Sequence, residues 1–187
     1  MKSFAIFALG VLLAPVALAQ QQTFVVNPDA SEVKMTLKTT HEVVNGTFHI
    51  QSGSLAFDRS AAKMSGSVVV LAGSGKTGNG SRDKRMNKEI LRVEQYATIS
   101  FEPRSYTGAI APSGDSTIQV TGIFTLAGMP HDITIPMLVH LDGATATVKT
   151  HFTVPYIQWG LKDPSFLFWK ADHDVTVDLF LTGRLST

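Results

Sequence analysis

Apolar and polar residues alternate with a period of two along much of this chain, and that pattern limits the folds open to it. The longest series has apolar side chains at every second position over residues 133–141, and another occupies residues 175–181. Successive side chains of a β-strand point to opposite faces, so this spacing predicts strands with one buried face each. Shorter runs that predict strands occupy residues 33–37, 55–57, 68–71, 99–101, 118–124 and 146–154.

Turn-forming residues separate these runs. Among them are the pairs Pro28-Asp29, Asn45-Gly46 and Asp142-Gly143, whose residue types favour tight turns. About eight short strands at this spacing predict an all-β fold, either a sandwich or a closed antiparallel barrel. Only closure removes both edges of a sheet. With no internal repeat and no linker, the sequence predicts one domain over residues 20–187.

Composition excludes several classes of protein. The 187 residues contain no cysteine, which rules out disulfides, thiolate metal sites and a cysteine nucleophile. Charged residues make up 17% of the chain, with 16 Lys and Arg against 15 Asp and Glu, so the basic excess of a nucleic-acid-binding protein is missing. The hydrophobic share of 44% is typical of a globular chain and not of a disordered one.

Residues 1–19 have the three parts of a secretory signal peptide. Lys2 supplies the positive start, residues 4–13 are almost continuously apolar, and Ala17-Leu18-Ala19 is a small-residue cleavage site. The apolar run is short for a membrane span. We therefore expect cleavage near Ala19 and export, with the periplasm as the expected location.

One segment departs from the β pattern. Its apolar residues lie three or four positions apart, as on one face of a helix: Met86, Ile90, Val93 and Ala97. The sequence therefore predicts one helix, inserted near residues 81–94, and we expect Arg82 and Asp83 to fix its start. The other Lys and Arg residues of this helix either face solvent or contact anionic lipid headgroups.

Motifs for catalysis and cofactor binding are weak or missing. Residues 73–78 match the G-x-G-x-x-G pattern of dinucleotide sites, but such a site needs a strand–helix–strand unit in a parallel sheet. The six histidines lack the H-x-x-x-H spacing of metal sites. We expect no metal, no resident cofactor and no catalytic residue. An enzyme stays an alternative only if polar groups such as His41, His151 and Asp58 converge inside the barrel.

An ordered set of short motifs resembles the YceI family of secreted bacterial proteins. The motifs are Gly46-x-Phe48, Gly53-x-Leu55-x-Phe57-Asp58, Gly78-Asn79-x-Ser81-Arg82-Asp83, Tyr96-Ala97-Thr98-Ile99-Ser100-Phe101 and Val120-x-Gly122-x-Phe124-x-Leu126-x-Gly128. The resemblance covers residues 23–185. Two features depart from the family pattern: Ala97 stands where proline is usual, and residues 158–165 replace an Arg-x-x-Phe-Gly stretch.

The resemblance implies a lipocalin-like antiparallel β-barrel that binds a polyisoprenoid lipid in its interior. Some members of the family are fused to or associated with membrane cytochrome b561, which implies quinone handling and a cytochrome b561-type protein as a partner. We therefore expect a periplasmic binding protein for a polyisoprenoid or a quinone, not an enzyme. The alternative is a ligand-free structural or stress-linked β-domain that acts through protein partners.

Strand parity, the alternation of side chains between the two faces of a strand, and apolar character together predict which side chains face the barrel interior. An eight-stranded barrel is just wide enough to be filled by side chains or to hold one small ligand, and an isoprenoid tail suits walls without hydrogen-bonding groups. The predicted ligand-binding side chains are Met35, Leu37, Phe48, Phe57, Val70, Phe101, Phe124, Ile135, Met137, Phe152 and Val177. A predicted rim that gates the mouth or lies at a membrane surface contains Trp159, Phe166, Phe168 and Trp169.

Overall fold

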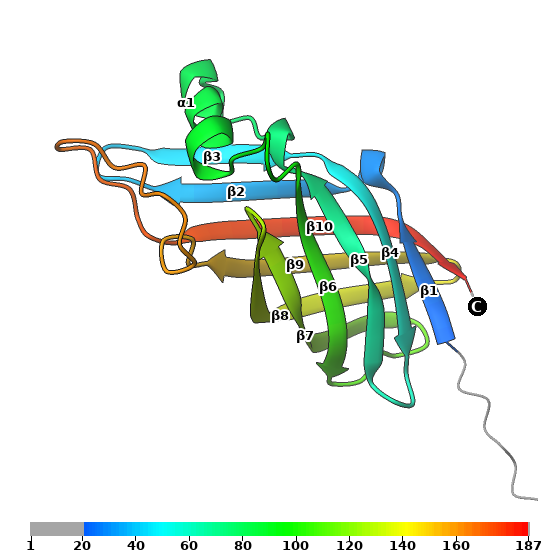
Figure 1. Ribbon diagram of the computed structural model, residues 1–187. Coiled ribbons are helices and arrows are strands. Elements are labelled where there is room, and N and C mark those ends of the chain that lie inside the picture. The colour runs from blue at the N-terminus through cyan, green and yellow to red at the C-terminus, as the bar shows by residue number, and fades with distance from the viewer. Residues whose placement is uncertain (1–20, 187) are drawn as a thin grey trace, which may run out of the picture.

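Eight antiparallel strands close into a barrel in the computed structural model, which describes residues 21–186 (Figure 1). In order around the barrel they are β1 (Gln21–Val26), β4 (Ile50–Asp58), β5 (Lys63–Leu71), β6 (Thr98–Thr107), β7 (Gly114–Leu126), β8 (Met129–Asp142), β9 (Thr145–Val154) and β10 (Val175–Ser186). The barrel closes where β1 pairs with β10, which places Phe24 opposite Leu185 and Val26 opposite Gly183. The antiparallel barrel predicted from the sequence is thus confirmed.

Two further strands lengthen one end of the barrel. β2 (Glu32–Lys38) pairs with residues 176–180 of β10, and β3 (Val43–Phe48) pairs with β2. β1 pairs with residues 183–186 of the same strand. β10 has 12 residues, so it can hold β2 and β1 one after the other along one edge. The prediction of about eight strands therefore holds for the barrel, while the whole sheet has ten.

The alternating pattern decides which side chains of each strand lie inside. Along β8, Ile135, Met137, Val139 and Leu141 are buried, and the residues between them are exposed. β7 repeats the pattern through its first half. One face of each of these strands therefore forms the barrel interior, as the period of two predicts.

The turn predictions are partly confirmed. Pro28-Asp29 begins a short 3-10 turn, and Gly143 in the β8–β9 connection has a φ of 56°. The prediction of a turn at Asn45-Gly46 is wrong, because both residues lie inside β3. Gly46 is opposite Met35, and a Cβ there would come within 3.2 Å of the Met35 side chain. Glycine at this position permits close packing between strands.

The predicted helix is present but shorter than residues 81–94. α1 (Gly80–Arg85) is capped by the Asn79 side chain and continues as a single π-helical turn over Met86–Ile90. The helical backbone stops there because Arg92 has a φ of 50°, in the left-handed region that cannot extend a right-handed helix. The last positions of the predicted helix are therefore wrong.

Buried apolar residues form two clusters. One occupies the barrel itself and includes the large side chains of Phe24, Phe57 and Tyr106. The second lies where β2, β3, the helical segment and residues 155–171 meet, and it includes Leu37, Leu91 and Leu161. In Figure 1, α1 and the orange segment between β9 and β10 lie at this same end of the barrel. These segments form a cap with its own apolar contacts.

The predicted signal peptide, residues 1–19, lies outside the described residues. Within residues 21–186, no helix has the length and the apolar character needed to cross a bilayer. Export and a periplasmic location therefore stay predictions from the sequence.

Barrel closure depends on the absence of a side chain at Gly183. A Cβ at this position would lie 2.0 Å from the Val25 carbonyl oxygen and 2.8 Å from the Phe24 ring. We expect Gly183→Ala to lower the free energy of unfolding by about 1–3 kcal/mol, because the two strands must move apart. Urea denaturation followed by circular dichroism measures the change.

Gly80→Ala is the matched control. No atom lies within 4 Å of a Cβ at this position, and alanine favours the first turn of a helix more than glycine does. We expect this variant to be as stable as the wild type or slightly more stable. Equal losses in both variants would show that the β1–β10 contact is not the cause.

Candidate functional site

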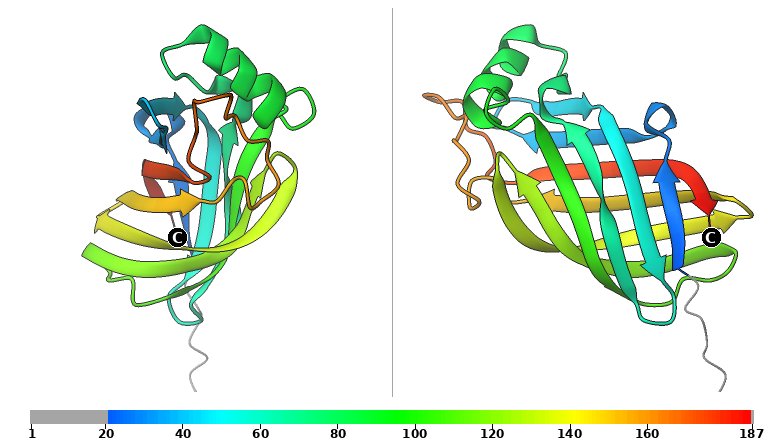
Figure 2. Two further views of the ribbon diagram at one scale, coloured as in Figure 1. Left: turned by 90° about the vertical axis from the view of Figure 1, so that its left-hand side faces the viewer. Right: turned by 45° about the vertical axis from the view of Figure 1, so that its right-hand side comes forward.

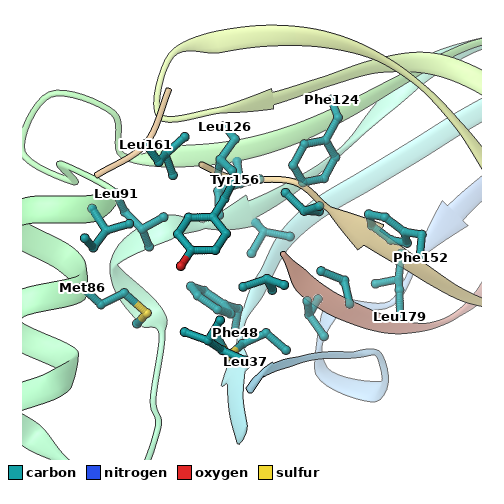
Figure 3. A pocket seen from close by; sticks show the side chains of 18 of the residues that line it. Leu37, Phe48, Met86, Leu91, Phe124, Leu126, Phe152, Tyr156, Leu161 and Leu179 are labelled. Atoms are coloured by element: carbon teal, nitrogen blue, oxygen red, sulfur yellow. The ribbon is translucent and has the colours of Figure 1, made fainter. Parts of the chain in front are cut away.

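A cavity of about 560 Å³ lies between the open end of the barrel and the cap. The strands supply most of its wall, and residues 77–91 and 156–169 supply the rest. Figure 2 shows the helical segment and the brown to orange segment over this end of the barrel. In Figure 3, Phe124, Phe152 and Leu179 approach the cavity from the strands, and Met86 and Leu91 approach it from the helical side. The barrel is thus hollow toward its capped end.

All but one of the predicted ligand-binding side chains line this cavity. They are Met35, Leu37, Phe48, Val70, Phe101, Phe124, Ile135, Met137, Phe152 and Val177. Phe57 is the exception: its side chain is buried in the barrel cluster, outside the cavity wall. Strand parity gives the face of a residue but not its height along the barrel, and Phe57 lies near the far end of β4. Contact of the ten lining residues with a ligand stays a prediction.

Part of the cavity wall comes from residues that strand parity cannot find. Met86, Ile90 and Leu91 line it from the helical segment, and Tyr156 and Leu161 line it from the β9–β10 connection. The sequence did indicate Met86 and Ile90, because their helical spacing places them on one apolar face. The other three stand in irregular backbone, where apolar character alone does not indicate a direction.

Polar side chains of the wall gather mostly on one segment, residues 77–85. Thr77, Asn79, Ser81, Arg82 and Arg85 all belong to the lining. Among the residues that the structure describes, these two arginines are the only charged members of the wall. The cavity therefore has one polar edge, formed by the start of α1 and the loop before it.

The rest of the wall is nearly free of polar groups. Tyr156 donates its hydroxyl to the Asp172 carbonyl oxygen at 2.8 Å, and burial raises the pKa of the Tyr156 phenol far above its usual value of 10. The phenol therefore stays neutral at any ordinary pH. Thr150 Oγ1 is buried and has no hydrogen-bond partner in the described part of the chain. Apart from the two arginines of the polar edge, the described wall therefore carries no charge.

Arg82 and Asp83 hold the loop before α1 in place, as the sequence predicts. Asp83 Oδ1 accepts hydrogen bonds from the Thr77 hydroxyl at 2.6 Å and the Thr77 amide at 2.9 Å. Arg82 donates from Nε to Thr77 Oγ1 at 2.9 Å, from Nη2 to the Thr77 carbonyl oxygen at 3.1 Å, and from Nη1 to Glu42 at 2.7 Å. Arg85 is less engaged, with its Nε 3.7 Å from a Glu89 oxygen.

The hydrogen bonds to Asp83 hold the pKa of its carboxyl below the ordinary value of 3.8. The Thr77 hydroxyl is the largest cause; burial opposes it, and the Thr77 amide and the charges of Lys76 and Arg82 add to the lowering. In the unfolded chain the carboxyl binds a proton near its ordinary pKa, whereas in the folded protein it does so only at lower pH. The carboxylate therefore stabilises the fold above pH 4, and this contribution is lost as the pH falls through the folded pKa.

The four predicted rim residues have different surroundings. Phe166 and Trp169 line the cavity. Trp159 lies behind the wall. Its ring stacks on the His131 ring with centroids 4.2 Å apart, and its centroid is 5.7 Å from that of the Phe124 ring. Phe168 is 88% exposed and does not line the cavity. Only Phe166 and Trp169 therefore border the mouth of the cavity.

The polar groups that would support an enzyme lie outside the cavity. His41 is exposed in the β2–β3 turn, and His151 is on the outer face of β9, where its Nδ1 lies 2.7 Å from Asp178. Asp58 accepts hydrogen bonds from Ser60 and Ala61 at the end of β4. None of the three lines the cavity, so they do not converge on a common substrate position.

Neither a dinucleotide site nor a metal cluster is found among residues 21–186. Residues 73–78 lie in a connection of a sheet whose strand pairs are all antiparallel, so the parallel unit of a dinucleotide site is missing. The described residues contain no group of three or more His, Asp or Glu side chains suited to a metal ion.

Comparisons with known proteins agree with this architecture. The model of one family, described as a YceI-like domain, matches residues 24–182. A UPF0312 protein of Pseudomonas syringae pv. tomato is 27% identical over 190 residues, which cover 95% of this chain and 96% of that protein.

Solved structures show the same fold at lower sequence identity. BcnA of Burkholderia cenocepacia superimposes with a TM-score of 0.68 at 19% identity, covering 84% of this chain and 99% of BcnA. A polyisoprenoid-binding domain from Saccharophagus degradans superimposes with a TM-score of 0.66 at 17% identity, covering 87% and 98%.

Replacing Asp83 by asparagine tests the pH dependence of the cap. Asp83→Asn keeps an oxygen acceptor for Thr77 but removes the charge. We expect the difference in unfolding free energy between wild type and variant to be constant above about pH 5 and to shrink as the pH falls below about 4. Urea denaturation at a series of pH values measures it.

Asp132→Asn provides the comparison for a surface acid. Asp132 is 80% exposed and lies 3.6 Å from Arg104, so we expect this variant to change stability little. Parallel stability curves for wild type and Asp83→Asn down to pH 3 would contradict the role assigned to the Asp83 carboxylate.

Proposed function

The chain belongs to the YceI-like domain family, and on that basis we propose that it is a binding protein that holds an isoprenoid-type lipid, a polyisoprenoid or a quinone, inside its barrel. The observation that carries the proposal is the apolar cavity of about 560 Å³. Its volume falls within the range of about 300–1,000 Å³ typical of small-molecule sites.

The cavity wall suits a tail without hydrogen-bonding groups. Each Å² of apolar surface removed from water contributes about 25 cal/mol, and part of this gain offsets the ordering of a flexible tail. Away from the polar edge, the wall gives an ion or a strongly polar group no compensation for its lost hydration. An apolar tail is therefore the chemical class that fits the wall best.

The polar edge of the cavity gives the ligand a direction. Thr77, Asn79, Ser81 and Arg85 offer hydroxyl, amide and guanidinium groups at one side of the mouth. We expect the tail to lie among the strands and the head group to lie beside this edge.

We propose the periplasm as the place where the protein acts. The pattern of residues 1–19 supports export to the periplasm, where the protein would carry its lipid between membrane proteins or membrane surfaces. A cytochrome b561-type membrane protein is the proposed partner if the ligand is a quinone.

Mass spectrometry of an organic extract from natively purified protein is the direct test. A near-stoichiometric isoprenoid or quinone is the expected result, and its mass identifies the head group. A stable protein that stays empty after incubation with isoprenoid lipids would favour the ligand-free alternative, in which the barrel acts through protein partners.

Phe124 is a suitable position at which to disturb the cavity wall. Its ring lines the wall and packs edge-on against Phe152, with ring centroids 6.0 Å apart. We expect Phe124→Asp to abolish lipid copurification, because an unpaired carboxylate in the wall is costly to desolvate. The same substitution should lower the melting temperature. Quantitative mass spectrometry of the extract measures occupancy.

Two controls separate ligand loss from instability. Phe124→Leu keeps the wall apolar and should retain the lipid. Phe57→Leu changes a ring in the packed part of the barrel, outside the cavity, and should cost stability by about 1 kcal/mol without changing occupancy. Full occupancy in a folded Phe124→Asp protein would refute the cavity as the binding site.

A further inference from the structure

Three consecutive large apolar side chains project into solvent beside the cavity mouth. Phe166, Leu167 and Phe168, here called the apolar tip, are 64%, 69% and 88% exposed. Single exposed apolar residues are common on protein surfaces, but a contiguous group of this size marks a contact surface. In Figure 1 the orange segment that carries the tip projects from the capped end of the barrel.

The tip is held in a defined conformation by its backbone. The amide of Phe166 donates to the Trp169 carbonyl oxygen, and the amide of Trp169 donates to the Phe166 carbonyl oxygen, both at 2.9 Å. The base of the tip is bound to the β2–β3 turn, where the Thr40 amide donates to the Lys170 carbonyl oxygen at 2.9 Å. The apolar side chains are therefore exposed on an ordered hairpin.

Leu167 adopts a backbone conformation that apolar residues seldom take. It is the first of the two turn residues and has a φ of 48°, at a position where glycine or asparagine is usual. A leucine there costs conformational energy that a glycine would avoid. Such a cost is typical of a residue whose side chain has a role in contacts with another molecule.

Charged residues of both signs surround the tip. Lys170 stands two positions after the tip, and Lys84 and Lys88 are exposed on the helical segment that borders the same cavity. None of the three forms an ion pair with another residue of 21–186, whereas Glu42 and Glu89 at this end are paired with basic side chains. The exposed acids Asp163, Asp172 and Asp174 also form no ion pair with a described residue, so the unpaired charge near the tip has both signs.

We propose that the apolar tip inserts into the interface of a lipid bilayer. Aromatic and leucine side chains on an ordered tip match the boundary between the headgroups and the acyl chains of a bilayer. Phe166 and Trp169 line the cavity, so insertion turns the mouth toward the membrane. A lipid tail then passes between bilayer and barrel without crossing water.

The apolar contribution outweighs the electrostatic one. The exposed acids Asp163, Asp172 and Asp174 offset the charges of the three exposed lysines at this end. We therefore expect binding to depend first on the tip and second on the lysines, each of which contributes about 1 kcal/mol near an anionic surface, or roughly fivefold in affinity.

Co-sedimentation with vesicles of phosphatidylethanolamine and phosphatidylglycerol tests the proposal. Leu167→Ser combined with Phe168→Ser removes apolar area without touching a residue of the cavity wall. We expect the double variant to bind these vesicles at least about tenfold more weakly than wild type. Lipid occupancy by mass spectrometry should not change, so this result is separable from the function proposed for the cavity.

A matched control removes an exposed apolar side chain elsewhere. Leu138 is 43% exposed on β8, opposite Thr117 of β7, and Leu138→Ser should bind vesicles as wild type does. Leu167→Gly separates the membrane contact of the side chain from the strain of its backbone. Glycine adopts this φ without strain, so the melting temperature should be equal or higher, whereas vesicle binding should fall. Equal vesicle binding by wild type and the double variant, or no binding by either, overturns the proposal.

Trp169 reports insertion directly. The chain has two tryptophans, so Trp159→Phe leaves Trp169 as the single probe beside the tip. We expect its emission to shift to shorter wavelength on mixing with the anionic vesicles, and brominated lipid to quench it. If the emission does not shift when vesicles are bound, the tip does not insert. If the tip instead makes the protein dimerise without vesicles, it serves a contact between two copies of the protein. Either result overturns the proposal.

Discussion

The two-part pairing along one edge of β10 is the constraint on which the rest of the structure depends. Residues 183–186 pair with β1 and close the barrel, and residues 176–180 pair with β2 and extend the sheet beyond it. Closure satisfies the backbone groups that would otherwise form open edges. The extension adds β2 and β3 at the end where the cap forms, so the interior continues past the eight-stranded ring.

This arrangement explains why the interior is packed in one part and hollow in another. In the closed part, large side chains such as Phe24, Phe57 and Tyr106 fill the narrow ring, as an eight-stranded barrel permits. Toward the cap the wall is completed by α1 and by the segment that follows β9. Because those segments span the end instead of filling it, space is left between them and the strands.

The sequence predicted the features that depend on local periodicity. Alternation along the strands gave the barrel and ten of the wall residues that lie on strands, because burial of one face fixes strand orientation. The sequence did not predict that Asn45-Gly46 lies within β3, since the close approach of Met35 that requires glycine there comes from a neighbouring strand. It also did not predict the position of Phe57 outside the cavity or the early end of α1, because both depend on how distant segments meet.

The barrel and the cap are stabilised by different kinds of contact. Apolar packing and a continuous ladder of backbone hydrogen bonds hold the barrel. Individual polar contacts hold much of the cap: Asp83 with Thr77, Tyr156 with the Asp172 carbonyl, and the Thr40 amide with the Lys170 carbonyl. These contacts supplement the apolar cluster of the cap, which includes Leu91 and Leu161. Opening of the cap would therefore leave the strand pairs that close the barrel intact.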